Sequence, residues 1–367
     1  MIFQNELQKT LKIFLILIMT SNLKILHICD THIRHFGRLF YSTGRKLQNG
    51  FIKNNVNCLN LSDRDITRLN KSLFDISGKK ALLKAIEENI KQFRPDIILI
   101  GHVDKLEYLD FISLKERNPH IVFAQWFLDP LIKDGGPDYD KNKERFLNKY
   151  QVCDFNFITT CPSQIDFVDE NKTFFIPNPI DPTIETLNIF ENKQFKKDLF
   201  IAISHGQHRG ILKSGYEDDR IDVINKINKN IELNLFGAMN KNPVWGTEFF
   251  NELNICKMGL NISRGKPIKY YSSDRIAALL GNGILTFMHS DYNYQDFLSA
   301  DEIIFYENIE DLNDKLLHYK KNDKDRQQIS RNGKVKSNEI FNNKIVAEFI
   351  LSKITEKTVS KTYSWMR

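Results

Sequence analysis

The sequence predicts an α/β protein of two domains, each with a parallel sheet covered by helices. Three observations lead to this prediction. The chain has 367 residues, more than one hydrophobic core usually organises. Short apolar runs alternate with helix-periodic stretches, which is typical of parallel sheets buried on both faces. Prolines at 177, 179 and 182 divide the alternation into two series, because so many prolines favour an extended, stiff connector.

The first series begins at Leu23 and predicts a Rossmann-like domain over residues 23–180. Its predicted strands each end in polar residues, and they are LKILHICD, VNCLNLSD, PDIILIGHVD, HIVFAQWFLD and CDFNFITT. Helix-periodic stretches such as GKKALLKAIEENIKQF lie between them. Apolar runs that alternate with helices in this way indicate a parallel sheet.

The second series restarts after the prolines and predicts a second Rossmann-like domain over residues 181–345. Its predicted strands are DLFIAISHG, IELNLFGA, KMGLNISR, GILTFM and EIIFYEN. From Asn308 onward the chain is almost entirely helix-periodic. We therefore expect C-terminal helices, with residues 346–367 forming a last helix and tail, and two domains that face each other across a cleft.

The first 22 residues carry a short apolar run, LKIFLILIM at residues 11–19. This run is too short to span a bilayer, which takes roughly 20 apolar residues, and no small-residue cleavage site follows it. Either Met19 is the true start or residues 11–19 form an interfacial anchor. We favour the first interpretation and treat residues 1–22 as a leader or a mis-assigned start.

The composition of the chain limits the kinds of binding partner and the cell compartment that we expect. The net charge of +6 is mild, and basic residues are interspersed with acidic ones. This suits acidic ligands or a membrane surface weakly, and a nucleic-acid platform less well. Five cysteines are scattered without CxxC spacing, so we expect a reduced, cytoplasmic compartment. The GxGxxG and GxxxxGK[ST] signatures of dinucleotide and P-loop sites are absent from the sequence.

The stretch YYSSDRIAALLGNG at residues 270–283 places four polar residues, Ser272, Ser273, Asp274 and Arg275, at one predicted helix start. Serine and aspartate are favoured helix caps, and Gly283 suits the turn that ends the helix. Capping explains only one polar residue. A helix start with spare hydroxyls and a guanidinium also suits an anion, so phosphate binding stays open beside capping.

Other candidates follow from the rule that open α/β sheets bind ligands at the carboxyl ends of their strands. The first domain offers His32 and Asp129 there, and the second offers His205, Arg209 and Arg264. The second-domain clusters SHGQHRG, NISRGKP and YYSSDR would surround a diphosphate with charge-assisted hydrogen bonds. Each cluster alone also fits a solvated basic rim. A paired-acid motif, DYD at residues 138–140, mimics a metal site but is common by chance.

The sequence resembles the group 1 glycosyltransferases of GT-B architecture, nearest the branch typified by spore-maturation-type proteins. The resemblance rests on the two-domain layout, PNPID, SHGQHRG and LNISRGKPIKYYSSDRIAALLGNG, and more loosely on NGFIKNN, SDRD and QWFLDP. It implies a nucleotide-sugar donor held mainly by the second domain, an acceptor facing the first, and no required metal or other cofactor.

Carried over by position, the resemblance makes Arg275 the arginine that opens the nucleotide-side helix and Gly283 the glycine that ends it. It places His205 and Arg209 in a loop where such enzymes often hold diphosphate. The family usually has a glutamate three residues after the arginine, where this chain has Ala278. Asp274 substitutes for that glutamate, or donor recognition differs, or activity is lost.

The expected function is transfer of a sugar from a nucleotide-diphosphate donor to a glycan, glycolipid or protein acceptor, such as a surface glycan precursor. Donor contacts are expected from His205, Arg209, Arg264, Ser272, Ser273, Asp274, Arg275 and Gly283. Asp129 and His32 are the candidate bases if the reaction inverts the anomeric centre, although Asp129 also suits a turn before Pro130 and His32 a helix cap. The alternatives are a sugar-nucleotide epimerase on the same architecture and a non-catalytic nucleotide- or glycan-binding protein, which Ala278 keeps open. Peripheral contact with the inner face of the membrane is a further expectation.

Overall fold

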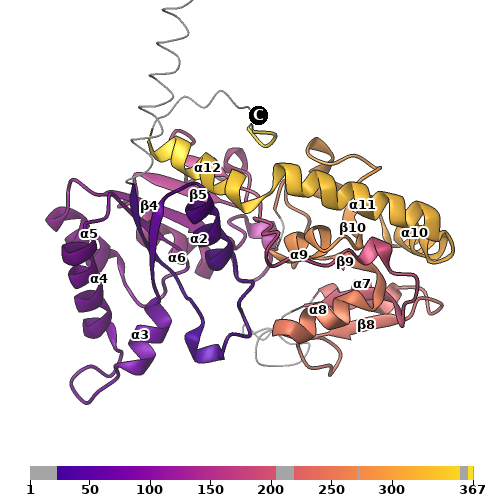
Figure 1. The fold of residues 1–367 in the computed structure, drawn as a ribbon, viewed down its shortest axis with the longest axis horizontal. Helices are drawn as coiled ribbons and strands as arrows, with labels where there is room; N and C mark the ends of the chain where they lie inside the picture. Colours follow the sequence, from indigo (N-terminus) through magenta and orange to yellow (C-terminus); the bar gives the residue numbers. More distant parts are fainter. Residues whose placement is uncertain (1–22, 204–218, 272, 356–362, 367) are drawn as a thin grey trace, which may run out of the picture.

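The computed structural model describes residues 23–203, 219–271, 273–355 and 363–366. Two parallel sheets with helices packed around them make up this part of the chain (Figure 1). The prediction of two parallel-sheet α/β domains with C-terminal helices is confirmed. The predicted leader, the His205 and Arg209 loop, and Ser272 lie outside the described residues.

The first sheet has six strands in the order β2-β1-β3-β4-β5-β6, and every neighbouring pair is parallel. The strands are β1 (Lys24–Ile28), β2 (Asn57–Leu61), β3 (Ile97–Ile100), β4 (Val122–Phe127), β5 (Phe155–Ile158) and β6 (Thr173–Phe175). Strand β3 is Ile-Ile-Leu-Ile, and all four residues are buried, as expected where helices cover both faces of a parallel sheet. The helices are α2 (Thr43–Lys53), α3 (Asp63–Leu69), α4 (Lys79–Phe93), α5 (Tyr108–Arg117) and α6 (Tyr139–Tyr150).

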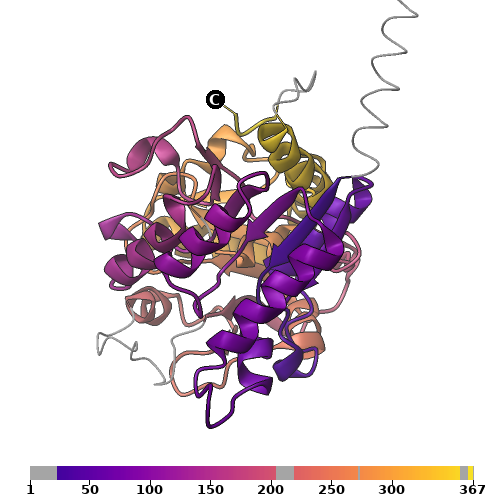
Figure 2. The same cartoon turned by 90° about the vertical axis from the view of Figure 1, so that its left-hand side faces the viewer.

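The second sheet has five strands in the order β11-β10-β9-β7-β8, again with parallel neighbours. They are β7 (Lys197–Ala202), β8 (Leu233–Phe236), β9 (Cys256–Asn261), β10 (Leu285–His289) and β11 (Ile304–Tyr306). Its helices and the C-terminal ones are α7 (Arg220–Lys226), α8 (Gly246–Asn254), α9 (Arg275–Gly281), α10 (Ile309–Lys321), α11 (Asp323–Ile340) and α12 (Asn343–Ile354). In Figure 2 the first domain lies in front of the second.

The segment between Phe175 and Lys197 connects the two sheets and contains the three prolines. A buried ion pair fixes it to the first domain, because Lys46 Nζ of α2 lies 2.5 Å from Glu185 Oε1. The proposed boundary at residues 180 and 181 falls inside this segment. The exact domain limits stay a prediction.

The last long helix, α12, returns to the first domain and packs against α2 (Figure 1). The packing is close, since a Cβ on Gly50 would lie 2.2 Å from the carbonyl oxygen of Asn343. Helix α12 therefore packs on the first domain, although it follows the second domain in the chain. A membrane-crossing helix would need more length and more apolar residues than any helix of the described segments has.

Candidate functional site

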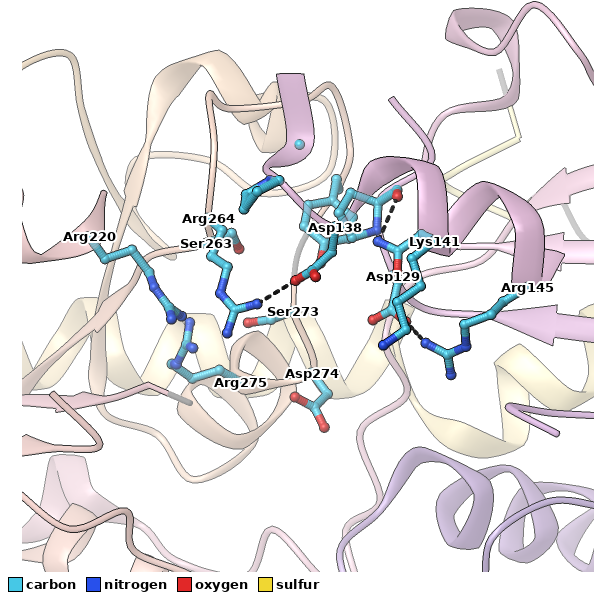
Figure 3. A pocket seen from close by; sticks show the side chains of 15 residues that line it. Asp129, Asp138, Lys141, Arg145, Arg220, Ser263, Arg264, Ser273, Asp274 and Arg275 are labelled. Carbon is cyan, nitrogen blue, oxygen red and sulfur yellow. Dashed lines mark hydrogen bonds and ion pairs between the residues drawn. The ribbon is translucent and has the colours of Figure 1, made fainter. Parts of the chain in front are cut away.

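A cavity of about 420 Å³ lies between the two domains at the carboxyl ends of both sheets (Figure 3). The first domain contributes the segment from the end of β4 into α6, and the second contributes the start of α7, the loop after β9 and the start of α9. The charged or hydroxyl side chains that line it are Asp129, Asp138, Lys141, Arg145, Arg220, Ser263, Arg264, Tyr271, Ser273, Asp274 and Arg275. The structure thus brings Asp129 together with four of the predicted donor-binding residues.

Arg275 opens α9, and main-chain oxygens fix its guanidinium. Its Nε donates to the carbonyl of Ala202 at 2.7 Å, and its Nη1 donates to the carbonyl of Ile262 at 2.7 Å. These carbonyls lie at the ends of β7 and β9. Burial lowers the pKa of Arg275 to about 10, and the positive charge of Arg220 contributes, so Arg275 is still protonated at neutral pH.

Arg220 is the first residue of α7, and Figure 3 shows its guanidinium next to that of Arg275. Both arginines start a helix, the end at which the helix dipole disfavours a cation. Arg275 forms no ion pair with a carboxylate within the described segments. Two adjacent guanidinium groups repel each other, and an anion bound to both would relieve that repulsion. The arrangement is chemically suited to a phosphate or diphosphate.

Arg264 also lines the cavity, but it contacts the opposite domain. Its Nη1 donates to Asp138 Oδ2 at 2.8 Å, an ion pair drawn in Figure 3. Asp138 belongs to the DYD stretch, whereas Asp140 is exposed and does not line the cavity. No group of three or more His, Cys, Asp and Glu in the described segments is arranged to hold a metal ion. A metal-free mechanism nevertheless remains a prediction.

The residues beside Arg275 divide into cavity-lining and structural positions. Asp274 occupies the N-cap position of α9 but accepts no capping hydrogen bond through its side chain. Capping therefore does not account for Asp274, which is exposed and, like Ser273, lines the cavity. Gly283 follows the other end of α9, where a Cβ would lie 2.6 Å from the ring of Phe190. Its location fits a packed turn, and a role in donor binding stays a prediction.

A second cavity, of about 310 Å³, lies beside the first and shares Asp274 and Arg275 with it. From the first domain it is lined by His32, Leu39, Tyr41, Ser42 and Lys46, and from the second it also includes Trp245, Phe249 and Ala278. His32 and Arg275, predicted separately as base and donor contact, therefore line one cavity. Ala278 lines it too, at the position where the family that the sequence resembles has glutamate.

His32 is held in an uncommon conformation by Asp30. Its backbone is left-handed, with φ at 60°, which is unusual for a residue other than glycine. Asp30 Oδ1 accepts a hydrogen bond from the His32 amide at 2.9 Å, and Asp30 Oδ2 lies 3.1 Å from His32 Nδ1. Burial alone would raise the pKa of Asp30, but hydrogen bonds from His32 and Arg34 hold it well below the usual range. An ionised Asp30 therefore orients the imidazole.

Asp129 faces Arg145 and His102 instead. Arg145 Nη1 lies 3.1 Å from Asp129 Oδ2, and His102 Nδ1 lies 3.6 Å from the same oxygen. Burial lowers the pKa of His102 to about 4, so that ring is neutral at pH 7. The Asp129 carboxylate is therefore already engaged in an ion pair with Arg145.

Several lining residues were not among the sequence candidates. Arg220 and Arg145 are the main ones, and the contact of Asp30 with His32, outside the two cavities, was not predicted either. Arg220 carries only a weak signal, an arginine at the start of a predicted helix, whereas Arg275 was singled out by four polar residues at its helix start and by the family resemblance. No comparable pattern marks Arg145, which reaches Asp129 from the second turn of α6.

Comparison with known proteins supports a glycosyltransferase-type second domain. Residues 216–352 match a family described as glycosyl transferase-like. A search of curated protein sequences found no match. The fold resembles Anabaena Alr3699/HepE in complex with UDP, with 11% identity, a TM-score of 0.55, and coverage of 91% of this chain and 100% of that one.

Two other solved structures are similar to nearly the same extent. AviGT4, a glycosyltransferase involved in avilamycin A biosynthesis, has 11% identity, a TM-score of 0.54, and coverage of 91% of this chain and 97% of that one. The N-terminal domain of Candida albicans trehalose-6-phosphate phosphatase has 12% identity, the same TM-score and the same coverage. At these identities the likeness establishes the fold alone, and that fold is the predicted GT-B architecture.

Proposed function

We propose that this protein is a glycosyltransferase that moves a sugar from a nucleotide-diphosphate donor to a glycan, lipid or protein acceptor. The observation that carries the proposal is the pair of adjacent guanidinium groups of Arg220 and Arg275, which open two helices at the cleft. The glycosyl transferase-like match over residues 216–352 supports it, as does the shared fold with a protein solved in complex with UDP.

The donor diphosphate would bind where Arg220 and Arg275 meet, with the hydroxyl of Ser273 beside them. Glycosyl transfer leaves negative charge on the departing diphosphate. Guanidinium groups that are already fixed by the fold stabilise that charge without reorganising. The sugar would then extend toward the second cavity, which shares Arg275 and Asp274 with the first.

If the reaction inverts the anomeric centre, we propose His32 as the general base. It shares a cavity with Arg275, and Asp30 would stabilise the imidazolium that forms when His32 takes the acceptor proton. Asp129 is the weaker candidate because Arg145 already pairs with its carboxylate. Asp129 is better suited to hold Arg145 in place at the cleft by electrostatic attraction.

Finer assignments belong to the same proposal. They are hexosyl transfer without a metal or cofactor, a cytoplasmic location, and membership of the spore-maturation-protein-like branch. The acceptor would face the first domain. The residues His205, Arg209 and Ser272 are proposed as further diphosphate contacts from their places in the sequence.

Incubation of the purified protein with a panel of nucleotide sugars tests the function. Release of nucleoside diphosphate through hydrolysis or transfer is the expected result. Interconversion of one nucleotide sugar into another would indicate an epimerase, and binding without turnover a non-catalytic protein. NMR of the first product distinguishes an inverted from a retained anomeric centre and decides whether a general base is required.

A further inference from the structure

Three loops present large apolar side chains to solvent at one edge of the molecule. Loop 33–40 exposes Ile33 and Phe36, loop 70–77 exposes Leu73, Phe74 and Ile76, and loop 239–245 exposes Met239 and Trp245. Phe36, Leu73 and Phe74 are 97%, 92% and 90% exposed. These loops, which adjoin η1 (Ile33–His35), α3 and α8, lie at the lower edge in both Figure 1 and Figure 2.

The most exposed pair is held outward by a tight turn. The Ser72 amide donates to the Asp75 carbonyl at 3.1 Å, and the Asp75 amide donates back to the Ser72 carbonyl at 3.2 Å. Leu73 and Phe74 form the tip between them. The carboxylate of Asp75 also accepts from the Ala81 amide at 3.0 Å, which ties the turn to α4. The fold therefore presents this apolar tip through specific hydrogen bonds.

Contacts join the three loops into one surface, which we call the apolar rim. Asp65 of α3 accepts hydrogen bonds from the amides of Ile33 and Arg34 at 2.9 and 3.0 Å, and α3 leads directly into loop 70–77. On the other side, the Arg38 guanidinium lies 5.9 Å from the Trp245 ring centroid. The apolar rim therefore spans both domains.

The charge around the apolar rim is predominantly positive. Exposed cations that belong to it or flank it are Arg38, Arg68, Lys71, Lys80 and Lys241. Within the described segments none of these five forms an ion pair. The nearby Asp63 and Asp65 are buried, Asp75 accepts hydrogen bonds within the turn, and Glu248 on α8 is an exposed acid beside Trp245, so the five cations outnumber the exposed acids. Surfaces that bind anionic lipid typically combine exposed apolar side chains with cations that have no acidic partner.

We propose that the apolar rim docks this protein on an anionic lipid bilayer. Phe36, Leu73 and Phe74 would enter the boundary between headgroups and acyl chains, and the cations would contact lipid phosphates. A bilayer fits better than a protein partner, because Phe36, Leu73 and Phe74 are separate projections and line neither of the two cavities. A fluid interface accepts such tips without shape complementarity.

Docking would also orient the cleft. The second cavity is lined by Leu39 and Trp245, so its mouth adjoins the apolar rim and would lie near the bilayer surface. An acceptor carried by the membrane would then reach His32 without leaving the lipid. This consequence for the acceptor rests on the proposed transferase function, whereas docking itself does not.

Co-sedimentation of the full chain with vesicles tests the proposal. We expect binding to vesicles of phosphatidylcholine with phosphatidylglycerol, weaker binding to phosphatidylcholine alone, and weakening by salt. The double variant Leu73→Ser and Phe74→Ser should bind roughly tenfold or more weakly with an unchanged melting temperature, since both side chains are exposed. Val335→Ser, an exposed apolar position on α11, is the matched control and should bind like the wild type.

Trp245 supplies a second measurement. It is the most exposed of the three tryptophans, since Trp126 and Trp365 are each only 5% exposed. Vesicle binding should shift its emission to shorter wavelength, and brominated lipid should quench it. Wild-type binding by the Leu73 and Phe74 double variant, or self-association through the apolar rim without vesicle binding, would overturn the proposal. Vesicle binding by a protein that turns over no nucleotide sugar would leave docking intact and reject the transferase.

Discussion

Arg264 and Asp138 join the two domains across the cleft, with Arg264 Nη1 2.8 Å from Asp138 Oδ2. Beside this ion pair the Lys266 amide donates to the Asp134 carbonyl at 2.8 Å. The backbones approach so closely that a Cβ on Gly265 would lie 2.2 Å from the Asp134 carbonyl oxygen. Contact between the two loops thus depends on glycine at 265.

We predict that Gly265→Ala separates these loops. The residue has φ at +72°, so alanine adds both left-handed strain and a clash with backbone. Gly37→Ala is the matched control, because Gly37 has φ at +79° and nothing within 4 Å of its Cβ position. Gly37→Ala should cost about 1–2 kcal/mol of stability from strain alone. Gly265→Ala should cost more and should also weaken nucleoside-diphosphate binding, as measured by thermal unfolding and titration calorimetry; equal effects at both positions would contradict the role of the contact.

The buried carboxyl group of Asp63 should give the protein an unusual dependence of stability on pH. It is fully buried, and a backbone hydrogen bond from Arg64 only partly compensates its carboxylate for the loss of water. Burial raises its pKa to about 6, although the positive charge of Arg64 opposes the shift. An unfolded aspartate titrates near 3.9. The raised pKa therefore favours the folded state below about pH 4, and this contribution is lost as pH rises through 6.

Asp63→Asn should accordingly stabilise the protein at pH 8 by roughly 2–3 kcal/mol, with the gain vanishing near pH 4. Asp65→Asn is the opposite case. Burial alone would raise the pKa of Asp65, but hydrogen bonds from Ser62, Arg34 and Ile33 lower it. That variant should lose stability at neutral pH, and the loss should shrink below about pH 4. Urea unfolding at several pH values checks both, and identical pH profiles would refute the assignment.

The strands and the cleft could be predicted from sequence because both depend on local patterns. An apolar run such as residues 97–100 is stable only in a strand whose sheet is covered on both faces. The rule on strand ends then places Asp129 and Arg275 at one cleft without knowledge of the packing. The segment at 173–175 was too short to be recognised and forms β6.

Pairings between distant residues could not be predicted in this way. Asp138 and Arg264 are 126 positions apart, and the buried pair of Lys46 and Glu185 joins α2 to the connector. Each depends on how the two sheets are placed, which periodicity does not encode. The return of α12 to the first domain is of the same kind, since its sequence reads only as another apolar helix.

The dyad of Asp30 and His32 leads to a kinetic prediction. His32→Ala should lower turnover by about 10²- to 10⁴-fold and leave nucleotide binding intact, as expected for loss of a general base. Asp129→Asn should have a smaller effect on turnover. Asp30→Asn removes the carboxylate that holds the imidazole, so kcat should fall while nucleotide binding stays intact. Unchanged kcat in Asp30→Asn would contradict that positioning role, and full activity in both His32→Ala and Asp129→Asn would mean a base elsewhere or a retaining mechanism.

Arg275 carries the sharpest prediction, because its guanidinium has both a structural and a binding role. Arg275→Ala leaves the carbonyls of Ala202 and Ile262 without their donor, which should cost about 1–3 kcal/mol of stability. It should also weaken nucleoside-diphosphate binding and lower turnover by roughly 10²-fold or more. Arg331→Ala, an exposed arginine on α11, is the control and should change neither binding nor turnover.

Arg275→Lys separates the two roles of this side chain. A lysine keeps the positive charge but cannot donate to two carbonyls and a phosphate with a rigid planar fork. We expect partial recovery of diphosphate affinity and little recovery of turnover, because the transition state depends on the direction of the donors as well as on charge. Calorimetric titration with several nucleoside diphosphates, below the melting temperature of the least stable variant, measures affinity apart from folding. Wild-type affinity in Arg275→Ala would make this arginine a structural residue at the start of α9 and would remove the main support for donor binding at the paired guanidinium groups.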